Sequence, residues 1–268
     1  MSKTLSKPLL HPRNRHLAKK GASYDFPALC AANPDLSPFV IAKDNDQQTL
    51  DFANDKAVKE LNRALLLNFY GLRFWDLPEQ YLCPPVPGRA DYIHYLADLI
   101  QQSTGIKNPK SKAIKGLDIG TGANLIYPIV GSFEYDWRFV ASDIDQASLA
   151  CAKNLIEFNP RLKSAVRLRM QSNSSAIFAG IVKQSDRFTF SMCNPPFHAS
   201  KQEAEKGTIR KLKNLNKTSE SPNCKPTLNF GGRGNELWCE GGERQFVSNM
   251  IEESQAYGQQ VLWFTSLV

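Results

Sequence analysis

The sequence lacks the features that mark a membrane protein, a secreted protein or a metal protein. Its 268 residues contain no run of eighteen apolar residues, which excludes a membrane-spanning helix, and no apolar core of signal-peptide length near the N-terminus. The six cysteines form no C-x-x-C pair, and no histidine stands at zinc-ligand spacing. We therefore expect a cytoplasmic protein with free thiols, no membrane contact and no metal site.

Two common phosphate-binding motifs are also incomplete. Gly120 and Gly122 stand two residues apart, but the third glycine of the dinucleotide fingerprint is replaced by Leu125. No Lys-Ser or Lys-Thr pair follows, as a phosphate loop would require. The glycines still allow a tight turn whose backbone can approach a ligand closely.

This turn is the first of three features that occur in a set order. It follows an apolar strand that carries Asp118, a residue that can bond the loop amides or reach a ligand's ammonium group through water. About twenty residues later a second strand, 137–142, ends at Asp143. A carboxylate at that position accepts hydrogen bonds from the two hydroxyls of a ribose. The apolar spacing over 146–158 then predicts the crossover helix back to the sheet.

The third feature is Asn194-Pro195-Pro196-Phe197, which follows a predicted buried strand over 188–193. The Asn194 side-chain oxygen and the Pro195 carbonyl can hold a conjugated NH2 group and stabilise the positive charge that grows on its nitrogen. Phe197 offers a flat face for a planar base. Taken alone, the tetrapeptide is also consistent with an ordinary turn in which the chain leaves a strand, because Pro-Pro and Asn are common in turns.

Together, the three features indicate an S-adenosylmethionine-dependent amino methyltransferase that transfers the methyl group directly and in line. Strands and helices alternate from Lys115 onward. This predicts an α/β protein with a Rossmann-like class I methyltransferase sheet and helices on both faces.

The chain divides into three expected parts. Residues 1–22 are expected to form a flexible basic arm, 23–82 a small and mostly helical region, and 83–268 the methyltransferase domain. Within the second part, apolar spacing predicts helices over 26–32 and 54–70. A further helix is expected over 89–101, ahead of the first strand of the sheet.

Three segments carry a more specific resemblance: residues 10–16, 84–94, and 228–232 running on to 238–243. They resemble the bacterial 23S ribosomal RNA (large subunit) adenine N6-methyltransferase family and, more distantly, the U6 small nuclear RNA adenine methyltransferases. The resemblance implies methylation of the N6 amine of an adenine in 23S ribosomal RNA. It also implies contacts to the methyl donor or its transfer geometry from Arg89, Gly120, Asp143 and Asn194, and places Ser175 near the donor's adenine.

Members of that family continue past the strand expected at 260–265 with a helix and two more strands. The sequence ends at Val268, so we expect the C-terminal strands to be missing and the activity of this polypeptide to be affected.

The net charge of +7 and the pI of about 9.1 favour a polyanionic partner. One basic cluster lies in the N-terminal segment and includes Arg13 and Arg15; a second follows the Asn-Pro-Pro-Phe motif. We expect both clusters to contact the phosphates of 23S ribosomal RNA, either naked or in a partly assembled large subunit, and the protein to be a monomer. The second cluster is represented by Lys206, Arg210, Lys211 and Lys213.

Three alternative functions stay open on the sequence. The same pair of acceptors would suit methylation of another conjugated amine, in DNA adenine, another RNA or protein glutamine. A nicotinamide-dependent oxidoreductase could use the glycine turn, although the Asn-Pro-Pro-Phe motif has no role there. A noncatalytic RNA-binding assembly factor would bind RNA without transferring a methyl group.

Overall fold

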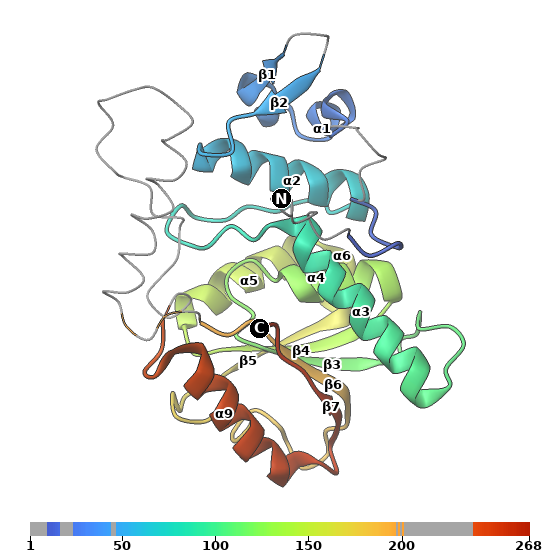
Figure 1. Cartoon of the computed structure of the whole chain (residues 1–268), viewed down its shortest axis with the longest axis vertical. Coiled ribbons are helices and arrows are strands. Elements are labelled where there is room, and N and C mark those ends of the chain that lie inside the picture. The colour runs from blue at the N-terminus through green and yellow to red at the C-terminus, as the bar shows by residue number, and fades with distance from the viewer. Residues whose placement is uncertain (1–9, 17–23, 44–46, 197, 199, 201–237) are drawn as a thin grey trace, which may run out of the picture.

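A five-stranded parallel sheet lies at the centre of the computed structural model (Figure 1). The structure describes residues 10–16, 24–43, 47–196, 198, 200 and 238–268. In spatial order the strands are β5 (Val166–Met170), β4 (Arg138–Asp143), β3 (Lys115–Ile119), β6 (Phe188–Cys193) and β7 (Val261–Phe264).

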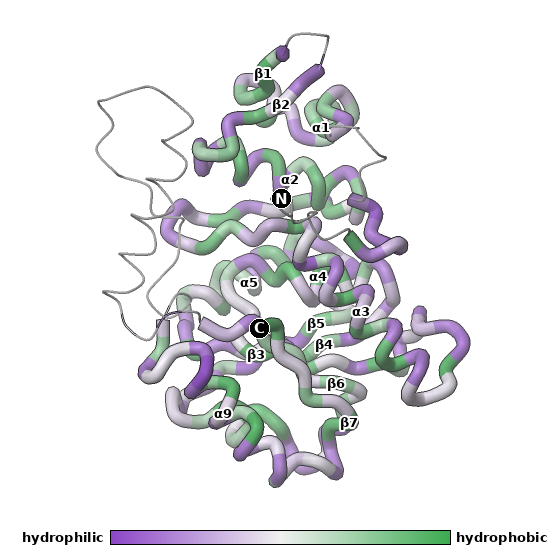
Figure 2. Tube along the Cα trace, viewed as in Figure 1, coloured by the Kyte–Doolittle hydropathy of each residue, from purple (hydrophilic) through white to green (hydrophobic). Residues whose placement is uncertain are grey.

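Helices cover both faces of the sheet, which confirms the predicted fold class. One face is covered by α3 (Val86–Thr104), α4 (Ile126–Tyr135), α5 (Gln146–Phe158) and α6 (Pro160–Ala165). The other is covered by α9 (Gly242–Ser254), followed by the short helix η3 (Gln255–Tyr257). Successive strand residues alternate between the two cores: Phe190 and Met192 pack with the first group, whereas Cys193 packs with the second. Figure 2 shows hydrophobic residues on the strands and on the adjoining helices.

The N-terminal region contains the two predicted helices and a hairpin that was not predicted. The helices are α1 (Phe26–Ala32) and α2 (Asp55–Tyr70), and the Asn54 side chain caps α2 by accepting from its first amides. Between them lie the short helix η1 (Pro34–Phe39) and an antiparallel pair, β1 (Val40–Ala42) and β2 (Gln48–Leu50). Strands of three residues are too short to give a periodic signal.

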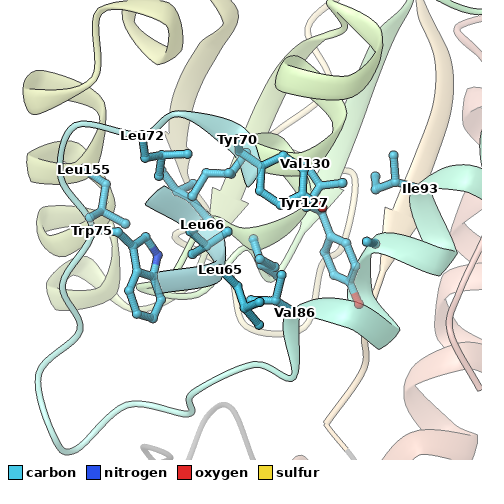
Figure 3. Close-up of a cluster of buried hydrophobic side chains, with 14 of the residues drawn as sticks. Leu65, Leu66, Tyr70, Leu72, Trp75, Val86, Ile93, Tyr127, Val130 and Leu155 are labelled. Atoms are coloured by element: carbon cyan, nitrogen blue, oxygen red, sulfur yellow. The ribbon is translucent and has the colours of Figure 1, made fainter. Parts of the chain in front are cut away.

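This region shares one continuous core with the sheet (Figure 3). Trp75 is fully buried between α2 and α5, close to Leu66 and Leu155, and its indole nitrogen donates to the Asn124 carbonyl at 3.2 Å. Because Asn124 belongs to the glycine turn, the N-terminal region supports the turn directly.

Residues 10–16 differ from the expected flexible arm, because they pack along α3 through buried polar side chains. His11 Nε2 lies 2.9 Å from Asp98 Oδ2, and Asn14 Nδ2 donates to the Pro87 carbonyl at 2.8 Å. His16 Nε2 lies 2.9 Å from the Tyr70 hydroxyl of α2. These long-range hydrogen bonds place this part of the segment in the folded body. None of the helices that the structure describes has the length and apolar character needed to cross a bilayer.

Candidate active site

A cavity of about 860 Å³ opens at the carboxyl ends of the parallel strands. The chain runs from β3 outward through β4 to β5, and then returns to the other side of β3 for β6 and β7. The cavity therefore lies at the point where the strand order reverses, the usual ligand site of a doubly wound sheet. Its lining includes the predicted residues Arg89, Gly120, Gly122, Asp143, Ser175 and Asn194.

The glycine turn is built by two residues in the left-handed conformation. Gly120 has φ 69° and Gly122 has φ 64°, a region that side chains disfavour. A Cβ on Gly120 would meet no described atom within 4 Å, so the turn is open toward the cavity. The Gly122 amide donates to Asp143 Oδ2 at 2.8 Å, which ties the turn to the end of β4.

Asp143 is half-buried at the tip of β4 and lines the cavity. Its Oδ1 accepts from the Asp145 amide at 2.9 Å. Burial raises its pKa, and these amide hydrogen bonds oppose the rise. The next residue, Ile144, is 42% exposed and also lines the cavity. A carboxylate beside an exposed apolar side chain suits a ribose joined to a flat ring.

Asp118 is not among the described residues that line the cavity. It is 1% exposed on β3, and its Oδ2 has no hydrogen-bond partner among the described residues. Burial raises the pKa of Asp118 to about 7, and the nearby charge of Asp143 adds to the rise. The contact of Asp118 with a donor stays a prediction.

Asn194 lies directly after β6 and is held by Arg89 of α3. Arg89 Nη1 donates to Asn194 Oδ1 at 2.8 Å and to the Tyr127 hydroxyl at 3.1 Å. An amide oxygen has two lone pairs, so one remains for a second donor. Tyr127, on α4, also lines the cavity and was missed by the sequence analysis, because nothing local distinguishes it from a core aromatic residue.

The rest of the Asn-Pro-Pro-Phe motif is described in part. Pro195 is buried and Pro196 lines the cavity. Phe197 and the basic residues Lys206, Arg210, Lys211 and Lys213 lie outside the described residues, so their roles stay predictions. His198 forms a parallel bridge with Trp238, which brings this second aromatic residue to the cavity wall.

Arg13 and Arg15, the basic residues within the described part of the N-terminal segment, are engaged within the chain. Arg13 pairs with Asp98 and donates to the His94 carbonyl at 3.0 Å. Arg15 Nε lies 2.6 Å from Glu134 Oε1. Their predicted RNA contacts are not tested by the structure. Among the residues that the structure describes, no three His, Cys, Asp or Glu side chains cluster as metal ligands.

The strand order, the acidic strand tip and the amide at the tip of β6 define a Rossmann-like methyltransferase. A match to the family described as "RNA methyltransferase" spans residues 4–268, and the chain belongs to this family. It is 52% identical over 263 residues to "Ribosomal RNA large subunit methyltransferase F" of Pseudomonas putida, covering 98% of this chain and 81% of that protein. The protein of the same name from Flavobacterium johnsoniae is 53% identical over 259 residues, covering 97% and 80%.

Solved structures with the same fold come from human METTL16. Its catalytic domain in complex with MAT2A 3′UTR hairpin 6 is 30% identical, with a TM-score of 0.74, and the alignment covers 97% of this chain and 82% of that chain. Its N-terminal domain in complex with SAH is 27% identical, with a TM-score of 0.70, over 96% and 82%.

Proposed function

We propose that this RNA methyltransferase acts on the N6 amine of an adenine in large-subunit (23S) ribosomal RNA and uses S-adenosylmethionine as the methyl donor. The observation that carries the proposal is the Asn194 amide oxygen, held at the tip of β6 inside the switch-point cavity. The names of the bacterial relatives support ribosomal RNA as the substrate. Such a substrate favours the cytoplasm as the place of action.

The residues around the cavity fit this donor. The open turn at Gly120 suits the methionine part of the donor, the Asp143 carboxylate suits its ribose, and the exposed Ile144 suits its base. Arg89 places a positive charge in the same cavity. S-adenosylmethionine supplies a methyl group on a sulfonium, which is already an excellent leaving group. The protein then has to contribute mainly alignment and charge stabilisation, and positioning of this kind can contribute roughly 7–11 kcal/mol.

Asn194 and the Pro195 carbonyl are the residues proposed to hold the amine. Each would accept one N–H, which aims the nitrogen lone pair and stabilises the charge that develops there. No general base is required, because the methylated ammonium is acidic enough to release its proton to water or to either acceptor. The adenine has to leave any helix to reach this site, at a cost of a few kcal/mol that unpaired RNA reduces.

Asn194→Ala tests the amine-holding role. We expect it to remove most turnover, by about 100-fold or more as for other lost oxyanion-type contacts, while calorimetry shows S-adenosylhomocysteine affinity close to wild type. Asn108→Ala is the matched control, because Asn108 lies in the loop before β3, at the amino end of this strand and away from the cavity at its carboxyl end. Normal methylation by Asn194→Ala would refute the role.

The substrate is tested with labelled donor and RNA from a strain that lacks the gene, both deproteinised and within partly assembled large subunits. We expect label on N6 of an adenine in 23S ribosomal RNA. Label on DNA or protein would identify another amine as the substrate, and RNA binding without any transfer would indicate an assembly factor. Competition by NAD rather than S-adenosylhomocysteine would indicate an oxidoreductase. We further propose that the protein acts as a monomer.

A further inference from the structure

Glu253, at the end of α9, binds three consecutive backbone amides of the loop that follows β5. Its Oε2 accepts from the Ile177 amide at 2.7 Å, and its Oε1 accepts from the Phe178 and Ala179 amides at 3.0 and 2.6 Å. Hydrogen bonds to an ionised acceptor are stronger than neutral ones. A single carboxylate from a distant element therefore fixes this stretch of backbone.

A residue of the loop itself, Gln171, forms a second set of hydrogen bonds that hold the loop. Gln171 is 6% exposed; its Nε2 donates to the Ala179 carbonyl at 2.9 Å, and its Oε1 accepts from the Asn173 amide at 3.0 Å. Ser174, Ser175 and Ala176, between these anchors, line the cavity. The loop 171–179 is thus held at both ends while its middle faces the ligand space.

The strand order indicates which part of the donor meets this loop. Asn194 follows β6, the glycine turn follows β3, Asp143 ends β4, and the loop 171–179 follows β5. A donor with its reacting end at β6 and its ribose at Asp143 has to extend its nucleobase toward β5. The shape of the loop therefore sets the space for the nucleobase.

We propose that Glu253 is a positioning residue for the methyl-donor site, and that it holds loop 171–179 in the shape that the donor's nucleobase requires. The inference rests on the proposed function, because it takes S-adenosylmethionine as the donor. Glu253 acts through the loop, since it is not among the described residues that line the cavity. Helix α9 lines the same cavity through Gln245, Phe246 and Asn249, so the helix that carries Glu253 is itself part of the site.

Glu253→Gln is the test, because glutamine keeps the size but presents one oxygen and one NH2 group to three amide donors. We expect the Kd for S-adenosylhomocysteine, measured by calorimetry without RNA, to rise about tenfold. The KM for the donor should rise similarly, while kcat at saturating donor and the KM for RNA stay near wild type. Glu252→Gln, an exposed carboxylate on the same helix, is the matched control and should change none of these values.

Glu253→Asp, which is shorter by one methylene, should weaken donor binding less than Glu253→Gln, because it keeps the charge. Wild-type affinity in Glu253→Gln would overturn the inference. So would a parallel rise of both KM values with a lower urea midpoint, since that would mean a general loss of the fold. Failure of the wild-type protein to bind S-adenosylhomocysteine would instead refute the proposed function.

Discussion

At the tip of β6, the contact between Arg89 and Asn194 determines which way the amide faces. Arg89 Nη1 lies 2.8 Å from Asn194 Oδ1. With the amide reversed, two N–H groups would meet, so the guanidinium favours the oxygen at this position. The oxygen keeps a second lone pair, which is what the proposed role of Asn194 requires.

Asp143 shows how one carboxylate can serve both the fold and the ligand. Its two oxygens accept from the amides of Gly122 and Asp145 at 2.8 and 2.9 Å, and each oxygen has further lone pairs for ribose hydroxyls. Asn at this position would keep one acceptor and lose the charge.

We expect Asp143→Asn to weaken donor binding, because a hydrogen bond to a charged group contributes about 1.5–3 kcal/mol. Calorimetry with S-adenosylhomocysteine should show at least a tenfold higher Kd, about the equivalent of 1.4 kcal/mol. Asp51→Asn is the control: Asp51 Oδ1 also accepts a backbone amide, from Ala53 at 2.9 Å, but in the N-terminal region. An unchanged Kd in Asp143→Asn would remove this residue from the ribose site.

At the scale of elements, the sequence analysis was most accurate where local signals mark both ends. The predicted helix 146–158 and strand 188–193 coincide with α5 and β6. Asp145 caps α5 by accepting from the Ala147 and Ser148 amides, which is a strictly local signal. The strand predicted at 137–142 is shifted by one residue relative to β4, and α3 begins three residues before the predicted start at Arg89.

The elements and contacts that were missed depend on distant parts of the chain. The β1–β2 hairpin has only three residues in each strand. Residues 10–16 look polar and basic, yet their partners lie about 80 residues away on α3. In the site, residues at strand ends could be recognised from their order along the chain. Tyr127 and Glu253 could not, because their contacts exist only after α4 and α9 have packed.

The packing of residues 10–16 against helices should make stability depend on pH. Burial, with the nearby charges of His94 and Arg15 adding, lowers the pKa of His16 from 6.5 to about 4. On acidification the unfolded chain then binds a proton before the folded one does. The stability that is present above about pH 6.5 is therefore lost as the pH falls toward 4.

We expect urea unfolding of the wild-type protein to show a lower free energy of unfolding at pH 5 than at pH 7.5. His16 should account for about 1–2 kcal/mol of the difference. His16→Gln, which cannot titrate, should be less stable at pH 7.5 but should lose less stability on acidification. His198→Gln is the control, because His198 lies outside the segment. If the pH dependence of His16→Gln equals that of the wild type, His16 is not the group responsible.

At the scale of the whole molecule, one continuous core joins the N-terminal region to the sheet, and two of the predicted RNA-binding residues are engaged beside it. Arg13 and Arg15 are paired with carboxylates of α3 and α4, which reduces what they can offer to phosphates. The net charge of +7 must then act through other residues. The sequence places Lys206, Arg210, Lys211 and Lys213 shortly after the Asn-Pro-Pro-Phe motif, and we expect them to contact the phosphates that flank the target base.

We expect replacement of these four residues by Gln to weaken RNA binding and to flatten its salt dependence. Each phosphate contact releases counterions and contributes about 0.7–0.9 to the slope of log K against log salt, so four lost contacts should reduce the slope by roughly 2.8–3.6. Affinities measured by filter binding at several salt concentrations give this slope.

The control for this experiment removes four charges from Lys107, Lys110, Lys112 and Arg138. These residues precede or begin β3 and β4 and so lie at the amino ends of the strands, opposite the cavity. Both variants lose the same net charge, so long-range attraction falls equally, and only direct phosphate contacts distinguish them. Equal slopes in the two variants would show that the cluster after the motif contributes charge but no contacts, and the bound RNA would then have to be positioned by other residues.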